Sequence, residues 1–279
     1  MKPGIHDLKN SAYHCGEGLS SSGLKELIKS PAHFKHWIEN PIEQTPQMAL
    51  GSLVHAMILE PNKADEEFAC GKFNVRRGKE FDACVAANPG KTILSEEQFN
   101  EANRIREAFL RERDLNPDLQ ALTEGMKEKS FFWEDKTTGV QCKVRPDCLT
   151  AHGVISDLKT TSDASFDAFQ KQMVDLKYFV SGAFYLEGVG EAIAQGNLDI
   201  RIPDRFSFVC LETKAPYAIK IYHLDSKAIE IGQTLVRLAL SRFAESVATD
   251  EWPGYDRTPV TMDLPSWAYW KLNHLTGSK

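Results

Sequence analysis

The segment 140–161 constrains the fold of this chain most, because strand and turn signals alternate along it. It reads VQCKVRPDCLTAHGVISDLKTT. Extended patterns over 141–149 and 154–160 flank a short polar stretch that ends in Gly153, which predicts two strands joined by a turn. Pro146 stiffens the backbone directly before Asp147. We therefore expect a hairpin that brings the ends of these two strands together.

Three charged side chains are expected to meet on this hairpin. Asp157 and Lys159 are two residues apart, and alternate residues of a strand share a face. The hairpin can place Asp147 beside Asp157. Two carboxylates beside one ammonium group are suited to bind a hard divalent cation and to leave the lysine near a bound water. The alternative is a solvated ion pair on an exposed edge strand, where this spacing is common.

A histidine interrupts the apolar helix that we predict over 46–60. Apolar residues at helical spacing favour the helix, and Pro61 ends it. His55 is either a satisfied core residue or, because Gly51 and Ser52 permit close packing, a side chain that points over the neighbouring sheet. Glu60 is either structural or reaches the same cavity.

The segment 62–90 is irregular and carries a basic group, Arg76, Arg77 and Lys79, among glycines. It is either a flexible loop that meets phosphates or a solvated surface loop. The helix predicted over 95–114 begins at Ser95, a good N-cap. Its charges alternate in sign, which favours a solvated face.

The order of elements predicts an α/β fold. Besides the segments above, we expect helices over 19–40, 163–188 and 227–247, and strands over 128–134, 206–211 and 217–224. This order describes a mixed sheet with helices on both faces. We expect one domain, with a mainly helical part (1–127), a part with the catalytic sheet and helices (128–248) and a tail (249–279) that docks through Trp252, Trp267 and Trp270.

Composition excludes some classes of protein. The apolar fraction of 42% and the charged fraction of 26% are ordinary for a globular domain of 279 residues. A net charge of −6 argues against coating nucleic acid with the whole surface, but leaves open a nuclease with one basic groove. We find no membrane span and no signal peptide, and therefore expect a cytoplasmic protein without a membrane partner.

These motifs, in this order, resemble the PD-(D/E)xK nuclease superfamily, and more closely the RecE-type exonuclease (exonuclease VIII) catalytic domain of prophage recombination systems. The resemblance spans roughly 19–247, and its pieces are LSSSGLKELIKSPAHFKHW, GSLVHAMILEP, KVRPDCL, ISDLKTT and YFVSGAFYLEG. It implies a restriction-endonuclease-like fold, with a mixed β-sheet core flanked by helices and an N-terminal helical section.

The resemblance also implies a metal site. His55, Asp147 and Asp157 are expected to ligate Mg²⁺, for which Mn²⁺ substitutes, and the backbone carbonyl of Leu158 is a further candidate ligand. Lys159 is expected to position or deprotonate the attacking water.

Further residues are expected to support this site or to bind substrate. Glu60 and Glu128 are candidate additional acids. Tyr185 matches the tyrosine of a Q-x-x-x-Y motif, but Ser181 stands where the motif has glutamine, so Tyr178 is an alternative contact. The loop residues Arg76, Arg77 and Lys79 are expected to grip DNA phosphates.

The function implied by the resemblance is metal-dependent 5′→3′ degradation of linear double-stranded DNA from its ends. The product would carry 3′ single strands for a single-strand annealing protein. A ring-shaped homo-oligomer, trimer or tetramer, is also implied. Two alternatives remain: a structure-specific endonuclease on the same fold, and a non-catalytic DNA-binding or scaffold protein with a vestigial site.

Overall fold

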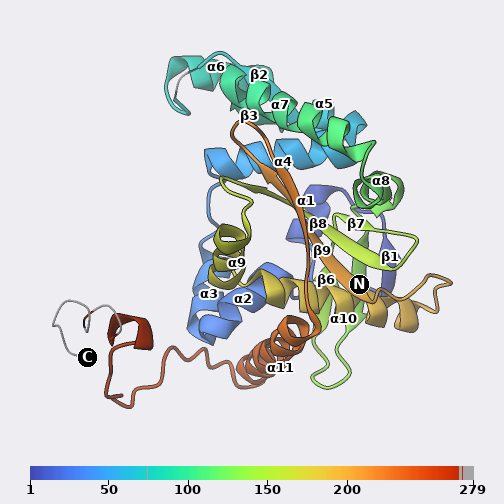
Figure 1. The fold of residues 1–279 in the computed structure, drawn as a ribbon. Coiled ribbons are helices and arrows are strands. Elements are labelled where there is room, and N and C mark those ends of the chain that lie inside the picture. Colours follow the sequence, from blue (N-terminus) through green and yellow to red (C-terminus); the bar gives the residue numbers. More distant parts are fainter. Residues whose placement is uncertain (74, 270–271, 273–279) are drawn as a thin grey trace.

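A five-stranded mixed sheet forms the centre of the protein (Figure 1). The structure is a computed structural model that describes residues 1–73, 75–269 and 272. Only β8 and β9 pair in parallel within this sheet, and its other neighbours are antiparallel. In spatial order the strands are β10 (Ile219–His223), β9 (Arg205–Glu212), β8 (Val154–Thr161), β7 (Cys148–Leu149) and β4 (Met126–Lys127).

Two smaller sheets flank the central one. An antiparallel sheet has the order β1 (Gly4–His6), β5 (Ser130–Glu134) and β6 (Gln141–Val144), and a parallel pair joins β2 (Phe68–Gly71) to β3 (Thr92–Ser95). The single strand predicted over 141–149 is therefore wrong, because β6 and β7 belong to different sheets. Pro146 lies between them, and its lack of an N–H group is unfavourable in a continuous strand ladder.

Helices cover both faces of the central sheet, as predicted (Figure 1). One apolar core packs β8 and β9 against five helices: α2 (Ser21–Lys29), α3 (Pro31–Glu39), α9 (Phe166–Asp175), α10 (Tyr178–Gly196) and α11 (Ser226–Thr249). The opposite core uses α4 (Pro46–Leu59), α7 (Glu96–Arg113) and α8 (Pro117–Glu124). The remaining helices are α1 (Asn10–Cys15), α5 (Pro61–Glu67) and α6 (Lys79–Ala87).

Side-chain caps explain where several helices begin. Ser20, Ser30 and Thr45 each accept a hydrogen bond from a backbone N–H in the first turn of the helix that follows. Ser95 and Gln98 form a reciprocal capping box at the start of α7. These starts agree with the sequence signals.

The single helix predicted over 163–188 is wrong. The chain forms α9 and α10 instead, and it changes direction at Lys177, whose φ of 52° lies in the left-handed region. Neither glycine nor proline marks this break, so local signals do not reveal it. The break lets α10 pack against β5 while α9 packs on β9 through Phe169, whose ring lies 5.5 Å from that of Phe208.

The C-terminal tail packs on the helical face near its start. The Trp252 ring stacks on Phe34 at 5.9 Å, and Trp267 is exposed. Trp270 lies outside the described residues. The division of the chain at 127 and 248 stays a prediction. No helix among the described residues is both long and apolar enough to cross a membrane.

Candidate metal centre

Three potential metal ligands converge beside the middle of β8, next to Asp157 and Leu158. One ligand atom each from His55, Glu128 and Asp147 lies within 4.8 Å of the other two. They come from α4, from the link between β4 and β5, and from the link between β6 and β7. The sequence places these residues far apart, so the fold alone assembles the group.

Backbone contacts fix Asp147 and Glu128 in this group. The Oδ2 atom of Asp147 accepts a 2.6 Å hydrogen bond from the N–H of Leu158 and lies 3.5 Å from Nδ1 of His55. Cys148 pairs with Ser156, so the same register places Asp147 opposite Asp157. The N–H of Glu128 donates to the backbone oxygen of Asp147 at 3.2 Å. Asp147 therefore connects all the elements of the group.

Asp157 and Lys159 lie beside this group and form an ion pair. Both project from the face of β8 that carries Ile155, as the alternation of the strand predicts. The Oδ2 atom of Asp157 is buried and makes no hydrogen bond besides this ionic contact, and Asp157 is not within the 4.8 Å group. The Lys159 ammonium also lies 5.2 Å from the centre of the Tyr178 ring.

Burial shifts the ionisation of these groups. Desolvation raises the pKa of Asp147 and outweighs the opposing effect of His55. Burial, followed by the charge of Asp147, raises the pKa of Glu128 to about 9. Burial lowers the pKa of Lys159, but the charges of Asp157 and Asp147 outweigh it, so the pKa is raised overall. Lys159 is therefore a permanent cation at neutral pH.

The donor set fits a hard divalent cation. It offers one imidazole nitrogen and the oxygens of two carboxylates, and Asp157 adds a buried oxygen that lacks a hydrogen bond. Oxygen ligands suit Mg²⁺, and a mixed oxygen and nitrogen set also suits Mn²⁺. The positive charge near Asp147 and Glu128 does not offset their burial, and the pKa values of both carboxyl groups are therefore raised. A bound cation would supply the missing positive charge.

The two tyrosines named from the sequence lie on α10 near this group. Burial, Tyr13 and the carboxylates of Asp157 and Asp147 raise the pKa of Tyr185 well above its ordinary value, so its hydroxyl keeps its proton. Tyr178 contacts Lys159. Ser181, at the expected glutamine position, instead accepts a 2.8 Å hydrogen bond from the hydroxyl of Ser21 on α2.

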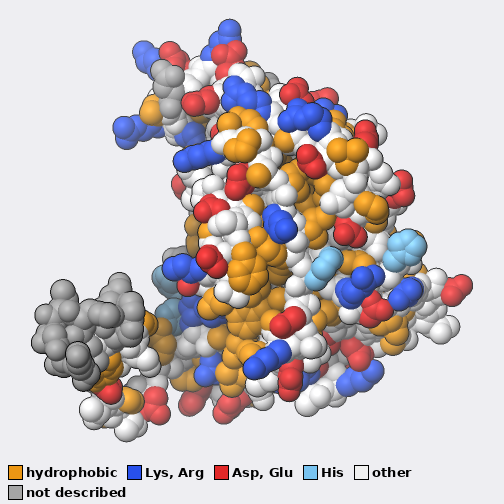
Figure 2. Space-filling view, in the orientation of Figure 1, with side chains coloured by type: hydrophobic (Ala, Val, Ile, Leu, Met, Phe, Trp, Pro, Cys, Tyr) orange, Lys and Arg blue, Asp and Glu red, His pale blue; other side chains and the backbone are white. Residues whose placement is uncertain are grey.

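Other predicted residues lie outside the group. Glu60 pairs with Lys63 at 2.6 Å. Arg76 donates to the backbone oxygen of Gln44, and Arg77 and Lys79 are exposed at the α6 end of the molecule (Figure 1). Figure 2 shows Lys and Arg side chains at this end, interspersed with acidic ones. The basic residues Arg76, Arg77 and Lys79 therefore lie apart from the candidate metal ligands.

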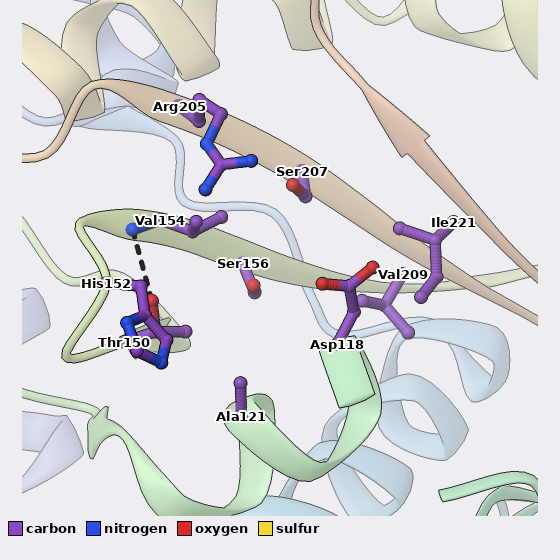
Figure 3. Close-up of a pocket in the computed structure, with 10 residues that line it drawn as sticks. All are labelled: Asp118, Ala121, Thr150, His152, Val154, Ser156, Arg205, Ser207, Val209 and Ile221. Atoms are coloured by element: carbon purple, nitrogen blue, oxygen red, sulfur yellow. Dashed lines mark hydrogen bonds between the residues drawn. The ribbon is translucent and has the colours of Figure 1, made fainter. Parts of the chain in front are cut away.

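Two cavities lie near the sheet. One of about 550 Å³ is lined by Tyr185 and by the start of α2, Ser20 to Gly23. The other, of about 110 Å³, is lined by Ser156 of β8 and by Arg205 and Ser207 of β9 (Figure 3). Because neighbouring strand residues point to opposite faces, this second cavity lies on the other face of the sheet from Asp157.

Sequence signals do not single out Lys25 of α2. Its ammonium group lies 5.6 Å from the centre of the Tyr178 ring, on which Lys159 also lies. The segment around it, SSGLKELIK, reads as an ordinary amphipathic helix with exposed lysines. Only the packing of α2 on α10 reveals that this lysine differs from its neighbours.

Comparison with known proteins places the fold. No curated protein matches this sequence significantly. The crystal structure of a candidate exonuclease from Eubacterium rectale is similar, with a TM-score of 0.61 and 16% identity over 98% of this chain and all of that one. A phage-related exonuclease from Haemophilus somnus 129PT has a TM-score of 0.36 and 12% identity over 87% of this chain and all of that one.

A family model identifies the chain itself. It matches residues 20–258, which include every ligand candidate and all buried residues of the two cores except Leu19. Together with the mixed sheet and its flanking helices, this match confirms the restriction-endonuclease-like fold and the PD-(D/E)xK superfamily. The chain belongs to the family described as PDDEXK-like domain of unknown function (DUF3799).

Proposed function

We propose that this protein is a divalent-metal-dependent DNA nuclease. The observation that carries the proposal is the convergence of His55, Glu128 and Asp147 at the strand that bears Asp157 and Lys159. The family description and the name of the Eubacterium rectale protein support it. Phosphodiester hydrolysis needs positive charge at the phosphate and an activated water, and such a site can provide both.

The metal-binding residues in this proposal are His55, Asp147 and Asp157, with the backbone carbonyl of Leu158. We add Glu128 to this set because one of its carboxylate oxygens lies within 4.8 Å of ligand atoms of both His55 and Asp147. When bound, Mg²⁺ or Mn²⁺ supplies charge neutralisation at a phosphate and acidifies a water molecule. Asp157 would hold the cation as well as Lys159.

Lys159 positions or deprotonates the attacking water in this proposal. In the metal-free protein the charges of Asp157 and Asp147 outweigh burial and raise its pKa, so its ammonium group donates hydrogen bonds. Contact with Asp157 and the ring of Tyr178 holds it in place. Tyr185, which keeps its hydroxyl proton, is a hydrogen-bond donor for substrate.

The specific activity that we propose is that of a RecE-type exonuclease. It would degrade linear double-stranded DNA 5′→3′ and leave 3′ single strands for a single-strand annealing protein. A ring-shaped homo-oligomer around the DNA would make degradation processive. These features rest on the resemblance of the motifs around His55, Asp147 and Lys159.

One digestion experiment separates the alternatives. Linear duplex and closed circular DNA are incubated with the protein in Mg²⁺, in EDTA and with the Asp157→Ala variant. We expect loss of linear DNA in Mg²⁺ alone and an intact circle. Cutting of the circle would instead indicate an endonuclease. DNA binding without cleavage of either substrate, by folded wild-type protein, would indicate a non-catalytic role and contradict the proposal.

A further inference from the structure

Two ammonium groups share one aromatic ring at the edge of the proposed metal site. Lys159 Nζ lies 5.2 Å and Lys25 Nζ 5.6 Å from the centre of the Tyr178 ring. Lys159 pairs with Asp157, as described above. Lys25 comes from α2, a different part of the chain. A second cation therefore contacts the same ring, and the charge of Lys159 acts on it.

The packing of α2 on α10 fixes the position of Lys25. The Ser21 hydroxyl donates a 2.8 Å hydrogen bond to that of Ser181. Lys25 is one turn after Ser21, and Tyr178 is three residues before Ser181, so both contacts lie on the same pair of helix faces. Helix α2 thus meets α10 at the position where the Q-x-x-x-Y motif has its glutamine, and it brings Lys25 with it.

Lys25 has no anionic partner among the residues that the structure describes. Its contact is the Tyr178 ring, and no carboxylate forms an ion pair with it. Burial, followed by the charge of Lys159, lowers the pKa of Lys25 to about 8. The charges of Asp157 and Glu26 oppose this shift but do not outweigh it. Leaving a cation partly buried without an ion-pair partner is unfavourable. Lys29 on the same helix differs, because it is exposed and pairs with Glu26 at 2.8 Å.

The formal charges around Lys25 indicate what kind of anion could pair with it. The site contains three carboxylates, those of Glu128, Asp147 and Asp157. Two ammonium groups, Lys25 and Lys159, accompany them. A bound divalent cation would turn the formal charge of this set positive by one, and a phosphodiester group carries one negative charge. The missing partner of Lys25 therefore has the charge of a DNA phosphate.

We propose that Lys25 is a substrate-binding residue whose ammonium group contacts a backbone phosphate of the DNA strand held beside Lys159. The proposal rests on the nuclease function proposed above and adds a contact to it. The long flexible side chain presents a compact point charge, which suits a single phosphate oxygen. Its contact with Tyr178 limits the positions that the ammonium can take.

The test is the salt dependence of DNA binding. Binding of a labelled linear duplex whose linkages resist hydrolysis is measured at a fixed Mg²⁺ concentration and at several concentrations of monovalent salt. The proteins are wild type, Lys25→Gln, Lys25→Arg and the control Lys29→Gln. Loss of one phosphate contact should make the slope of log affinity against log salt shallower by about 0.9. We expect this for Lys25→Gln alone, with several-fold weaker binding, and recovery in Lys25→Arg.

Cleavage of linear DNA in Mg²⁺ is the second readout. The value of kcat/KM should fall for Lys25→Gln and stay at the wild-type level for Lys29→Gln. If Lys25→Gln unfolds, Lys25→Met repeats both measurements, because its unbranched side chain can still pack on Tyr178.

The outcomes separate this inference from the proposed function. Wild-type protein that neither binds nor cleaves DNA would contradict the function, and the inference with it. Wild-type cleavage with an unchanged salt slope in Lys25→Gln would overturn the inference alone. A lowered melting temperature with an unchanged slope would assign Lys25 a purely structural role and overturn it as well.

Discussion

The backbone N–H of Leu158 donates a hydrogen bond to Oδ2 of Asp147, 2.6 Å away. The same oxygen lies 3.5 Å from Nδ1 of His55. One carboxylate therefore links the central strand β8 to helix α4, which packs on the face opposite α10. This link explains how a histidine from one layer and the Asp157–Lys159 pair from the other approach the same part of β8.

We predict that Lys159→Met abolishes cleavage and destabilises the metal-free protein. The change leaves the carboxylate of Asp157, which is 9% exposed, without its cation. The free energy of unfolding should fall by roughly 2 to 3 kcal/mol, less than for a fully buried pair because Lys159 is 22% exposed. Urea unfolding in EDTA measures it.

The matched control is the double variant Asp157→Asn/Lys159→Met, which removes both charges. It should recover most of the lost stability and remain inactive. A double variant as unstable as the single one would show that the two charges do not compensate each other.

We predict that the metal-free protein loses stability as the pH rises from about 5 to 9. Burial raises the pKa of Glu128 to about 9 from an ordinary value of 4.5, so the folded state holds a proton that the unfolded state releases. When the folded state binds more protons, the free energy of unfolding falls with rising pH. Glu128→Gln removes this contribution and should show a smaller fall in melting temperature.

Glu124→Gln is the control for Glu128, since Glu124 is an exposed acid four residues earlier. It should follow the wild-type pH profile. Identical profiles for Glu128→Gln and wild type in EDTA would contradict the raised pKa of Glu128.

We predict that Arg76→Ala/Arg77→Ala weakens DNA binding and makes its salt dependence shallower, because each lost phosphate contact lowers the slope by about 0.9. Both residues lie in the basic loop before α6. Binding of linear duplex at several salt concentrations measures the effect. An unchanged slope would assign the loop to ordinary solvated surface, in keeping with the acidic side chains that surround it (Figure 2).

We predict that Gly188→Ala destabilises the protein by about 1 to 3 kcal/mol. A Cβ atom at Gly188 would overlap the buried indole ring of Trp133, which joins α10 to β5. Gly190→Ala is the control on the same helix, where a Cβ would lie 3.4 Å from Ile202. It should be neutral or stabilising by up to about 1 kcal/mol, because alanine favours helices. Equal effects in urea unfolding would contradict the close contact.

The sequence predicts the fold class and several elements well, because their signals are local. The caps at Thr45 and Ser95 place the starts of α4 and α7, and Gly153, with φ of 77°, forms the expected turn before β8. The division of 141–149 between two sheets and the break at Lys177 depend on tertiary packing. Pro146 marks an interruption of 141–149, but no local pattern shows that its two halves join different sheets, and none marks the break at Lys177.

The candidate site divides in the same way. Spacing alone places Asp157 and Lys159 on one face of a strand, and the structure pairs them. Glu128 enters the group through a backbone bond to Asp147, and Lys25 approaches Tyr178 only through the packing of two helices. Such contacts join residues distant in sequence, so spacing does not predict them.

The most direct test of the metal centre is a crystal of the protein soaked in Mn²⁺ and measured at a wavelength that gives anomalous signal from manganese. The proposal predicts an anomalous peak within about 2.5 Å of Nδ1 of His55 and of a carboxylate oxygen of Asp147. The peak should disappear in Asp147→Asn. A well-ordered crystal with Mn²⁺ bound elsewhere, and no peak between these residues, would contradict the account.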